Sequence, residues 1–423
     1  MTEDPLPCPP VSDFDAELYL RLIGERMLTD RSGENHGAGR PTIAEAAAAL
    51  IAVEAIDAPS AESVLDDYSF ATMLRNESNL RRPGMLRAVP PPGSSETKLL
   101  KPRRVVPCAR TIDQAQATMQ VRYVSLSKES TSVAVTWHPG SSGPWGGGPP
   151  RAVLTDDRGT SEAAPFHGGG SNQGMRGRLT TTGPLAPDTA WIELDGTRLE
   201  LTEEPSRFAA TLERLPAQDP AHQYLWQRIA EPSKLNDSRI EPAIEALVAA
   251  GALWAADPLL DEVRAVLEAL QRGPGPGVVP PSGTIPIPEP WQSLLARDGV
   301  QDGPTGSIVL GAVPPAFDGF SVAILDLESD ENRFRVDVEV APAVGRMPFD
   351  WGMGPRQLTW WAKDDRDNHY LGQRGHWSFN DDFGHGVIDF HPALDPRATQ
   401  LELLPTAHTT RAVISFSLPW TRR

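Results

Sequence analysis

Cysteine and long apolar runs are scarce in this sequence. Its 423 residues include only Cys8 and Cys108, which is too few for a disulfide framework and typical of a reducing compartment. The most apolar stretches, 43–56 and 240–253, contain glutamates and are shorter than the roughly 20 apolar residues of a membrane-spanning helix. Residues 1–10 lack the basic start and apolar core of a secretory signal. These absences predict a cytoplasmic protein with no membrane partner.

Positive charge is also in short supply. The chain has 39 Lys and Arg against 56 Asp and Glu, and its formal net charge of −17 disfavours nucleic acid as a partner of the surface as a whole. Only five of the basic residues are lysines, and the chain also has 36 glycines and 42 prolines. This composition is typical of a high-GC bacterial genome.

Motifs of known chemistry are missing as well. The segments 140–143 and 170–174 lack the Gly-x-Ser-x-Gly spacing of a nucleophile elbow. The glycine runs 146–148 and 168–170 are not followed by the Lys-Ser/Thr pair or the helix start of a phosphate-binding loop, so we expect them to lie in loops. The sequence therefore predicts no catalytic residue, metal or cofactor, and it favours a protein that is not an enzyme.

What the sequence does contain is an internal repeat. The segment 43–56 aligns with 240–253 without a gap, and 121–137 aligns with 322–338. In the second pair, apolar residues alternate with polar ones on both sides of a polar turn, which predicts a β-hairpin in each copy. The run 156–158, Asp-Asp-Arg, recurs at 364–366 in the same order along the chain. Such colinear matches indicate a tandem duplication.

The repeat predicts an α+β fold in which a small helical bundle and an antiparallel Ig-like β-sandwich each occur twice. The Ig-like resemblance concerns strand number and spacing only, since the Cys…Trp…Cys signature is absent, and it implies no activity. The expected segments are a helical unit at 10–80, a basic Pro/Gly-rich linker at 81–102, a sandwich at 103–203, a second helical unit at 215–271, a Pro/Gly-rich linker with a short helix at 272–305, and a second sandwich at 306–420.

Two long loops are expected at equivalent places, 157–177 and 365–386. The first contains mostly small residues, whereas the second is rich in histidines, acids and aromatic residues. Because binding residues are concentrated on loops, we expect any site on the β domains to lie in the second. Its candidate residues are His369, Tyr370, His376, Trp377, Asp381, Asp382 and His385.

Two other interpretations of this region stay open. A metal-dependent or hydrolytic enzyme would use the His/Asp-rich stretch 364–391, although its histidines are spaced more widely than the close ligand pairs of zinc sites. A glycan- or polymer-binding protein would use aromatic residues such as Trp377. Strand alternation places Trp360 and Trp361 on opposite faces, and the acidic runs at 156–157 and 364–368 are typical of turns capped by Asp side chains.

A basic connector precedes the first β segment. Between residues 75 and 110 there are nine basic residues and two acidic ones. Such a cluster docks either on the acidic surface of its own chain or on an acidic partner. Its candidate binding residues are Arg81, Arg82, Lys101, Arg103 and Arg104. Together these features favour a non-catalytic protein-interaction or regulatory protein with an unidentified protein partner.

Overall fold

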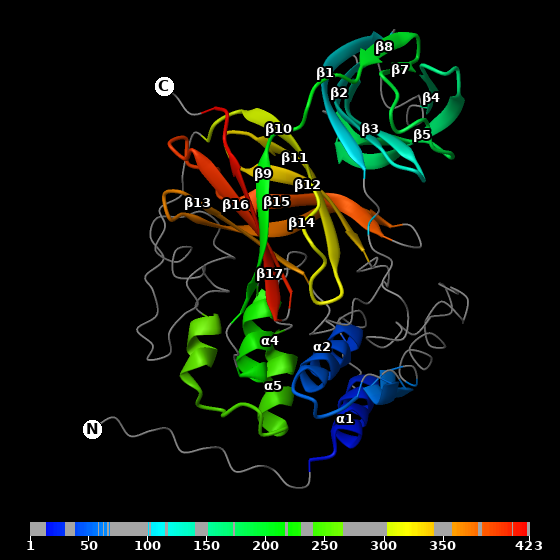
Figure 1. Ribbon diagram of the computed structural model, residues 1–423. Coiled ribbons are helices and arrows are strands. Elements are labelled where there is room, and N and C mark those ends of the chain that lie inside the picture. Colours follow the sequence, from blue (N-terminus) through cyan, green and yellow to red (C-terminus); the bar gives the residue numbers. More distant parts are fainter. Residues whose placement is uncertain are drawn as a thin grey trace.

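Two antiparallel β-sheets make up most of the structure (Figure 1). This computed structural model describes residues 14–29, 39–57, 59–61, 63–65, 67, 100, 103–114, 117–139, 151–171, 174–215, 219–229, 240–264, 303–341, 358–379, 383–407 and 409–420. Most of the predicted linkers 81–102 and 272–305, including the expected short helix, lie outside these ranges. No helix in the described ranges is both long and apolar enough to cross a bilayer.

The first sheet curls into a barrel-like ring in which β1 approaches β8 (Figure 1). The strand order is β1-β2-β3-β6-β5-β4-β7-β8. Alternate side chains, such as those of Val121, Leu154 and Leu179, point inward and form one buried apolar core. The strands are β1 (Arg104–Gln114), β2 (Ala117–Leu126), β3 (Thr131–Pro139), β4 (Arg151–Asp156), β5 (Ser161–Ser171), β6 (Gly174–Thr180), β7 (Trp191–Leu194) and β8 (Thr197–Glu200).

The second sheet has the same strand order, β10-β11-β12-β15-β14-β13-β16-β17, with β9 added beside β17. We call the two sheets the first and second barrels. The sequence did not predict β9, which falls between the expected units and has no counterpart among the described strands of the first barrel. The strands are β9 (Phe208–Arg214), β10 (Gly306–Ala312), β11 (Ser321–Ser329), β12 (Phe334–Ala341), β13 (Thr359–Asp364), β14 (His369–Phe379), β15 (Gly384–His391), β16 (Gln400–Thr406) and β17 (Thr410–Ser417).

The predicted α+β fold, with two helical bundles and two Ig-like sandwiches, is wrong. The chain is mostly antiparallel β, and its few short helices share one apolar cluster with Trp361, Leu371 and Leu404 of the second barrel. An Ala-rich helix such as α2 carries little apolar bulk, so it cannot complete a bundle core with one neighbour. The helices are α1 (Ala16–Thr29), α2 (Gly39–Ala52), α4 (Pro220–Ile229) and α5 (Ile240–Ala249).

Each sheet closes into a barrel, rather than dividing into two layers, because it contains a strand that pairs with one neighbour at its start and with another at its end. The start of β5 pairs with β4, as in Ala152 opposite Ala164, and its end pairs with β6, as in Phe166 opposite Leu179. Register shifts in β1 and β10 add local bends. These features curl each sheet on itself, which a pattern of strand lengths and turns does not reveal.

Several local predictions are confirmed. The two expected hairpins are β2–β3 and β11–β12. Trp360 lies in the core of the second barrel, while Trp361 points outward into the helical cluster. The alternation of a single strand was therefore enough to assign the two indoles to different faces.

The helices α2 and α5 end in the same way. After α2, Ala55 N–H donates to Leu50 O at 2.9 Å; after α5, Ala252 N–H donates to Leu247 O at 2.9 Å. This Schellman closure needs a left-handed residue just before the donor. That residue is Gly251, with φ 70°, after α5, but Glu54, with φ 58°, after α2. Glu54 therefore carries a strain that glycine avoids.

Replacing Glu54 by glycine should stabilise the protein. We expect Glu54→Gly to raise the free energy of unfolding by about 0.5 to 1 kcal/mol, because the left-handed strain exceeds the added chain entropy of glycine. Gly251→Ala, the matched control at the equivalent position, should lower it by about 1 kcal/mol. Urea unfolding of the full chain measures both effects, and a lower midpoint for Glu54→Gly would contradict the interpretation.

Candidate functional site at the junction of the two barrels

The two expected long loops are strands in the structure, so that prediction is wrong. Residues 161–180 form β5 and β6, and residues 369–391 contain β14 and β15. Glycine permits this close pairing: a Cβ on Gly168 would lie 2.3 Å from the carbonyl oxygen of Arg176. A Cβ on Gly386 would lie 2.5 Å from the carbonyl oxygen of His376. The glycines that suggested flexible loops instead allow neighbouring strands to approach each other.

Tyr370 and the acidic turn residues serve the second barrel itself. The Tyr370 hydroxyl donates to Asp364 Oδ2 at 2.6 Å and accepts the Asp395 N–H at 3.1 Å. Asp364 Oδ1 also accepts the N–H groups of Arg366 and Asn368, each at 2.9 Å. The predicted capping of this turn by an Asp side chain is confirmed, and Tyr370 is buried in the barrel core.

The first barrel builds its equivalent turn in the same way. Asp156 Oδ1 accepts N–H groups from Arg158 at 3.0 Å and Thr160 at 2.8 Å. Asp156 Oδ2 accepts the N–H of Ala186 at 3.2 Å. The Asp-Asp-Arg runs that the sequence pairs are therefore structural elements in both barrels, and we assign them no ligand.

Two hollows lie elsewhere on the described surface. One of about 430 Å³ is lined by His369 together with Lys363, Glu402 and Arg411. The other, of about 890 Å³, lies where β1 faces the β8–β9 connection and includes Arg104 in its wall. Arg104 is held there by the carbonyl oxygens of Thr189, at 2.8 Å, and Leu201. The role of Arg104 in this arrangement is to tie the end of β8 to β1.

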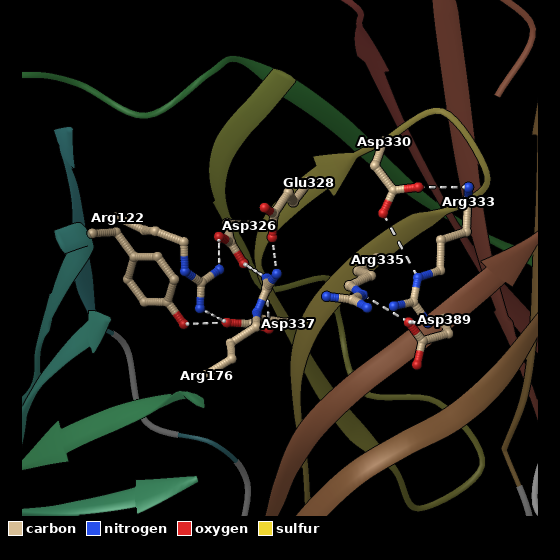
Figure 2. A network of polar contacts seen from close by, with 10 residues as sticks. Arg122, Arg176, Asp326, Glu328, Asp330, Arg333, Arg335, Asp337 and Asp389 are labelled. Atoms are coloured by element: carbon tan, nitrogen blue, oxygen red, sulfur yellow. Dashed lines mark hydrogen bonds and ion pairs between the residues drawn. The ribbon is translucent and has the colours of Figure 1, made fainter. Parts of the chain in front are cut away.

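The densest set of charges lies where the two barrels meet (Figure 2). Every positive charge in this set comes from the first barrel and every negative charge from the second. We call Arg103, Arg122, Arg176 and Arg178 the arginine face. We call Asp326, Glu328, Asp337 and Glu339, which lie on β11 and β12, the acidic face.

Direct ion pairs join the two faces. Arg122 contacts Asp326 and also lies 2.7 Å from Asp337. Arg178 lies 2.6 Å from Glu339. The same Glu339 carboxylate is 2.5 Å from Arg103. Four guanidinium groups thus face four carboxylates, and the charge of the junction is balanced.

Arg176 completes the set. It pairs with Glu328 and lies 3.3 Å from Asp337. Tyr123 lies beside these charges, and its hydroxyl donates to Asp337 Oδ2 at 3.3 Å. Figure 2 also shows a second group of ion pairs within the second barrel, where Arg335 lies 2.9 Å from Asp389.

The acids of this junction differ in their protonation. Burial is the largest influence on each, and it raises the pKa of Asp326 to about 6. For Asp337 the nearby Arg122 and Arg176 outweigh burial and hold the pKa well below its usual range. For Glu339 the guanidinium groups of Arg103 and Arg178 also lower the pKa against the effect of burial.

One buried apolar cluster fills the rest of the junction. It brings Leu100, Val105, Tyr123 and Ala134 together with Val309, Ala323, Leu325 and Ala341 of the second barrel. The interface therefore combines a small apolar contact with a large number of desolvated charges, a composition typical of contacts between separable domains.

The hydrogen bonding of the junction is incomplete. Seven of its buried side-chain atoms have no hydrogen bond of acceptable geometry, although several of them lie within ion-pair distance of an opposite charge. These atoms are Arg103 Nε, Arg122 Nε, Arg176 Nε, Arg178 Nη2, Asp326 Oδ1, Glu328 Oε2 and Glu339 Oε2. Because charges taken out of water lose hydration free energy, and incomplete hydrogen bonding recovers only part of it, the net contribution of this interface to stability is small.

Three of the residues that the sequence suggested lie at this junction. Arg103, from the basic connector, pairs with Glu339, and His385, from the predicted loop region, is opposite Glu339 in the pairing of β12 with β15. Burial, together with Arg178, lowers the pKa of His385 to about 3, so its imidazole is neutral. The ring of exposed His376 lies against the first barrel, 2.8 Å from where a Cβ on Gly169 would stand.

The remaining candidates fall elsewhere. Trp377 is half-buried and packs against the core of the second barrel. Arg81, Arg82, Lys101, Asp381 and Asp382 lie outside the described residues. Within the described ranges, His, Cys, Asp and Glu side chains form no group of three or more that could hold a metal ion. Burial also raises the pKa of the Cys108 thiol to about 11.

Most of the junction was not predicted from the sequence. Arg122, Asp326 and Asp337 lie on the two predicted hairpins, but none of them was among the candidate site residues. The available signal was the two acid-x-acid runs, 326–328 and 337–339, within otherwise apolar strands, against arginines at 122, 176 and 178 in the other copy. That contrast suggests two complementary surfaces, but spacing alone does not show that they touch.

Comparisons with known proteins give little guidance. No family model matches the chain, and no curated protein sequence matches it. One solved structure matches, described as the crystal structure of the conserved domain protein from Bacillus anthracis. It is 10% identical, with a TM-score of 0.18, and the match covers 72% of this chain and 78% of the other. A TM-score this low gives no basis for transferring fold or function.

Removing one charge from the junction should destabilise the protein strongly. We expect Arg178→Gln to lower the free energy of unfolding by about 3 kcal/mol, because Glu339 loses a buried partner. Arg158→Gln is the matched control, since Arg158 pairs with Asp188 on the surface and should change stability by at most about 0.5 kcal/mol. Equal losses in urea unfolding would contradict the importance of the junction.

The response to pH should separate the acids. The raised pKa of Asp326 favours the folded state as the pH falls from 7 toward 5, whereas the lowered pKa values of Asp337 and Glu339 contribute stability that is lost below about pH 4. Urea midpoints should therefore hold or rise slightly from pH 7 to 5 and fall below pH 4. Asp326→Asn should remove the rise, and Asp337→Asn should weaken the acid loss. A steep fall between pH 7 and 5 would contradict this assignment.

Proposed function

We propose that this chain is a non-catalytic protein-interaction protein of the cytoplasm, with a regulatory role exercised through the junction of its two barrels. The observation that supports the proposal is the convergence of Arg103, His376 and His385 on one interface. That interface holds complementary charges and recognises a protein surface, namely that of the second barrel. The arginine face of the first barrel therefore already binds one protein surface, the acidic face of the second barrel.

The composition of the junction also favours regulation. Its apolar part is one cluster of eight buried residues, and its charged part leaves buried atoms without hydrogen bonds. Relative motion is the default for domains joined by small polar interfaces. A partner that prefers the separated barrels would shift the chain toward that state by its difference in affinity for the two arrangements.

Neither alternative gains a specific observation. Tyr370, an aromatic candidate from the predicted loop region, is fully buried, and its hydroxyl donates a hydrogen bond to Asp364. His369 and His385 belong to different surroundings, one at the hollow beside β16 and the other at the junction. The residues suggested for hydrolysis or glycan stacking thus do not share one cleft.

The proposal predicts a protein partner that depends on the junction. We expect the full-length chain, isolated from its own cells, to retain a partner in a fixed ratio that quantitative mass spectrometry identifies. The double variant Asp326→Asn, Asp337→Asn should change the amount of that partner by at least about tenfold, because a few kcal/mol of interface energy is altered. Asp188→Asn, a surface acid, is the control.

Two results would contradict this function. One is a chain that retains the same proteins in both variants as in the wild type. The other is a bound metal ion at a fixed ratio together with hydrolytic turnover, which would favour the enzyme interpretation.

A further inference from the structure

The arginine face has a regular layout on the first barrel. Arg176 and Arg178 lie two residues apart on β6, and Arg122 lies on β2. Between these strands runs β3, where Ala134 is opposite both Tyr123 and Arg178 in the two pairings. The arginine side chains therefore lie on both sides of β3, which carries only the small side chain of Ala134 beside them. The face is shaped to receive an extended chain.

Its occupant in the structure has a matching layout. The acids of β11 and β12 follow an acid-x-acid pattern, 326–328 and 337–339, so the two carboxylates of each pair lie on the same side of an extended strand. Their spacing, about 7 Å, equals the spacing of two residues along β6. An extended segment with alternating acids would thus place each carboxylate opposite a guanidinium group.

The arginine face and the acidic face also match in the number of their charges and in how deeply these are buried. The side chains of Arg122, Arg176 and Arg178 are 11%, 13% and 5% exposed, and each pairs with a carboxylate of β11 or β12. Yet Nε of Arg122, Nε of Arg176 and Nη2 of Arg178 find no acceptor there. The barrel-bound hairpin therefore uses only part of the hydrogen-bonding capacity of the arginine face.

We infer that the arginine face is a binding surface for an extended acidic peptide segment of a protein partner, and that the acidic face of the second barrel is its built-in competitor. This inference rests on the proposed function and names the chemistry of its partner. A flexible peptide can adjust to the donors that the hairpin leaves unpaired. The groups that occupy the arginine face in the structure are carboxylates on extended strands, and this favours an acidic peptide over nucleic acid.

The test measures binding of a fluorescent peptide of alternating aspartate and threonine to the full chain by anisotropy. In Asp337→Asn, Glu339→Gln the competitor is weakened, so binding should tighten at least about tenfold over the wild type. In Arg122→Gln, Arg178→Gln binding should fall to the level of an asparagine–threonine peptide. Asp188→Asn, Glu162→Gln, which removes two acids outside the junction, should bind as the wild type does.

Several outcomes would overturn the inference. Unchanged affinity in the acid-neutral variant would show that the second barrel is not a competitor, and undiminished binding in the arginine variant would place the peptide elsewhere. Tighter binding of a single-stranded oligonucleotide would replace the partner class. If circular dichroism shows that either double variant fails to fold, the single variants Glu328→Gln, at the edge of the junction, and Arg176→Gln replace them with the same expected directions. If the peptide test fails but a junction-dependent partner is still retained from cells, the acidic-peptide inference is rejected and the proposed function is not.

Discussion

Ion pairs between the arginine and acidic faces determine how the parts of this chain fit together. Four guanidinium groups and the carboxylates of Asp326, Asp337 and Glu339 are largely removed from water where the barrels meet, and the energy regained depends on close placement of each pair, such as Arg178 and Glu339 at 2.6 Å. Any shift of one barrel leaves several charges buried without partners. The junction therefore specifies one arrangement of the two barrels even though its net contribution to stability is small.

The two barrels have the same strand order and the same Asp-capped turn, but opposite charge on the surfaces that meet. Both barrels have an apolar interior. They differ in the charged side chains on the strands that meet, which are β2 and β6 in the first barrel and β11 and β12 in the second. A protein with such complementary surfaces contains both a binding face and its occupant. Regulation by an external acidic segment then requires only that it compete with the internal one.

Local features of this fold could be predicted from the sequence, and long-range ones could not. Alternation identified the two hairpins and separated Trp360 from Trp361, because both depend on neighbours within one or two strands. Glycine runs in β5 suggested loops, since their close contact with β6 is a tertiary property. The closure of the barrels, the common helical cluster and the pairing of Arg122 with Asp337, 215 residues away, depend on which surfaces meet. No spacing rule encodes that choice.

We conclude that charge holds the two barrels together, and small-angle X-ray scattering of a charge-reversed full chain is the measurement that tests this conclusion. In Arg122→Glu, Arg178→Glu each glutamate would face the acidic face and repel it. The account predicts a larger radius of gyration than that of the wild type, with the far-ultraviolet circular dichroism of the strands retained. An unchanged radius, or loss of the strand signal together with the expansion, would contradict it.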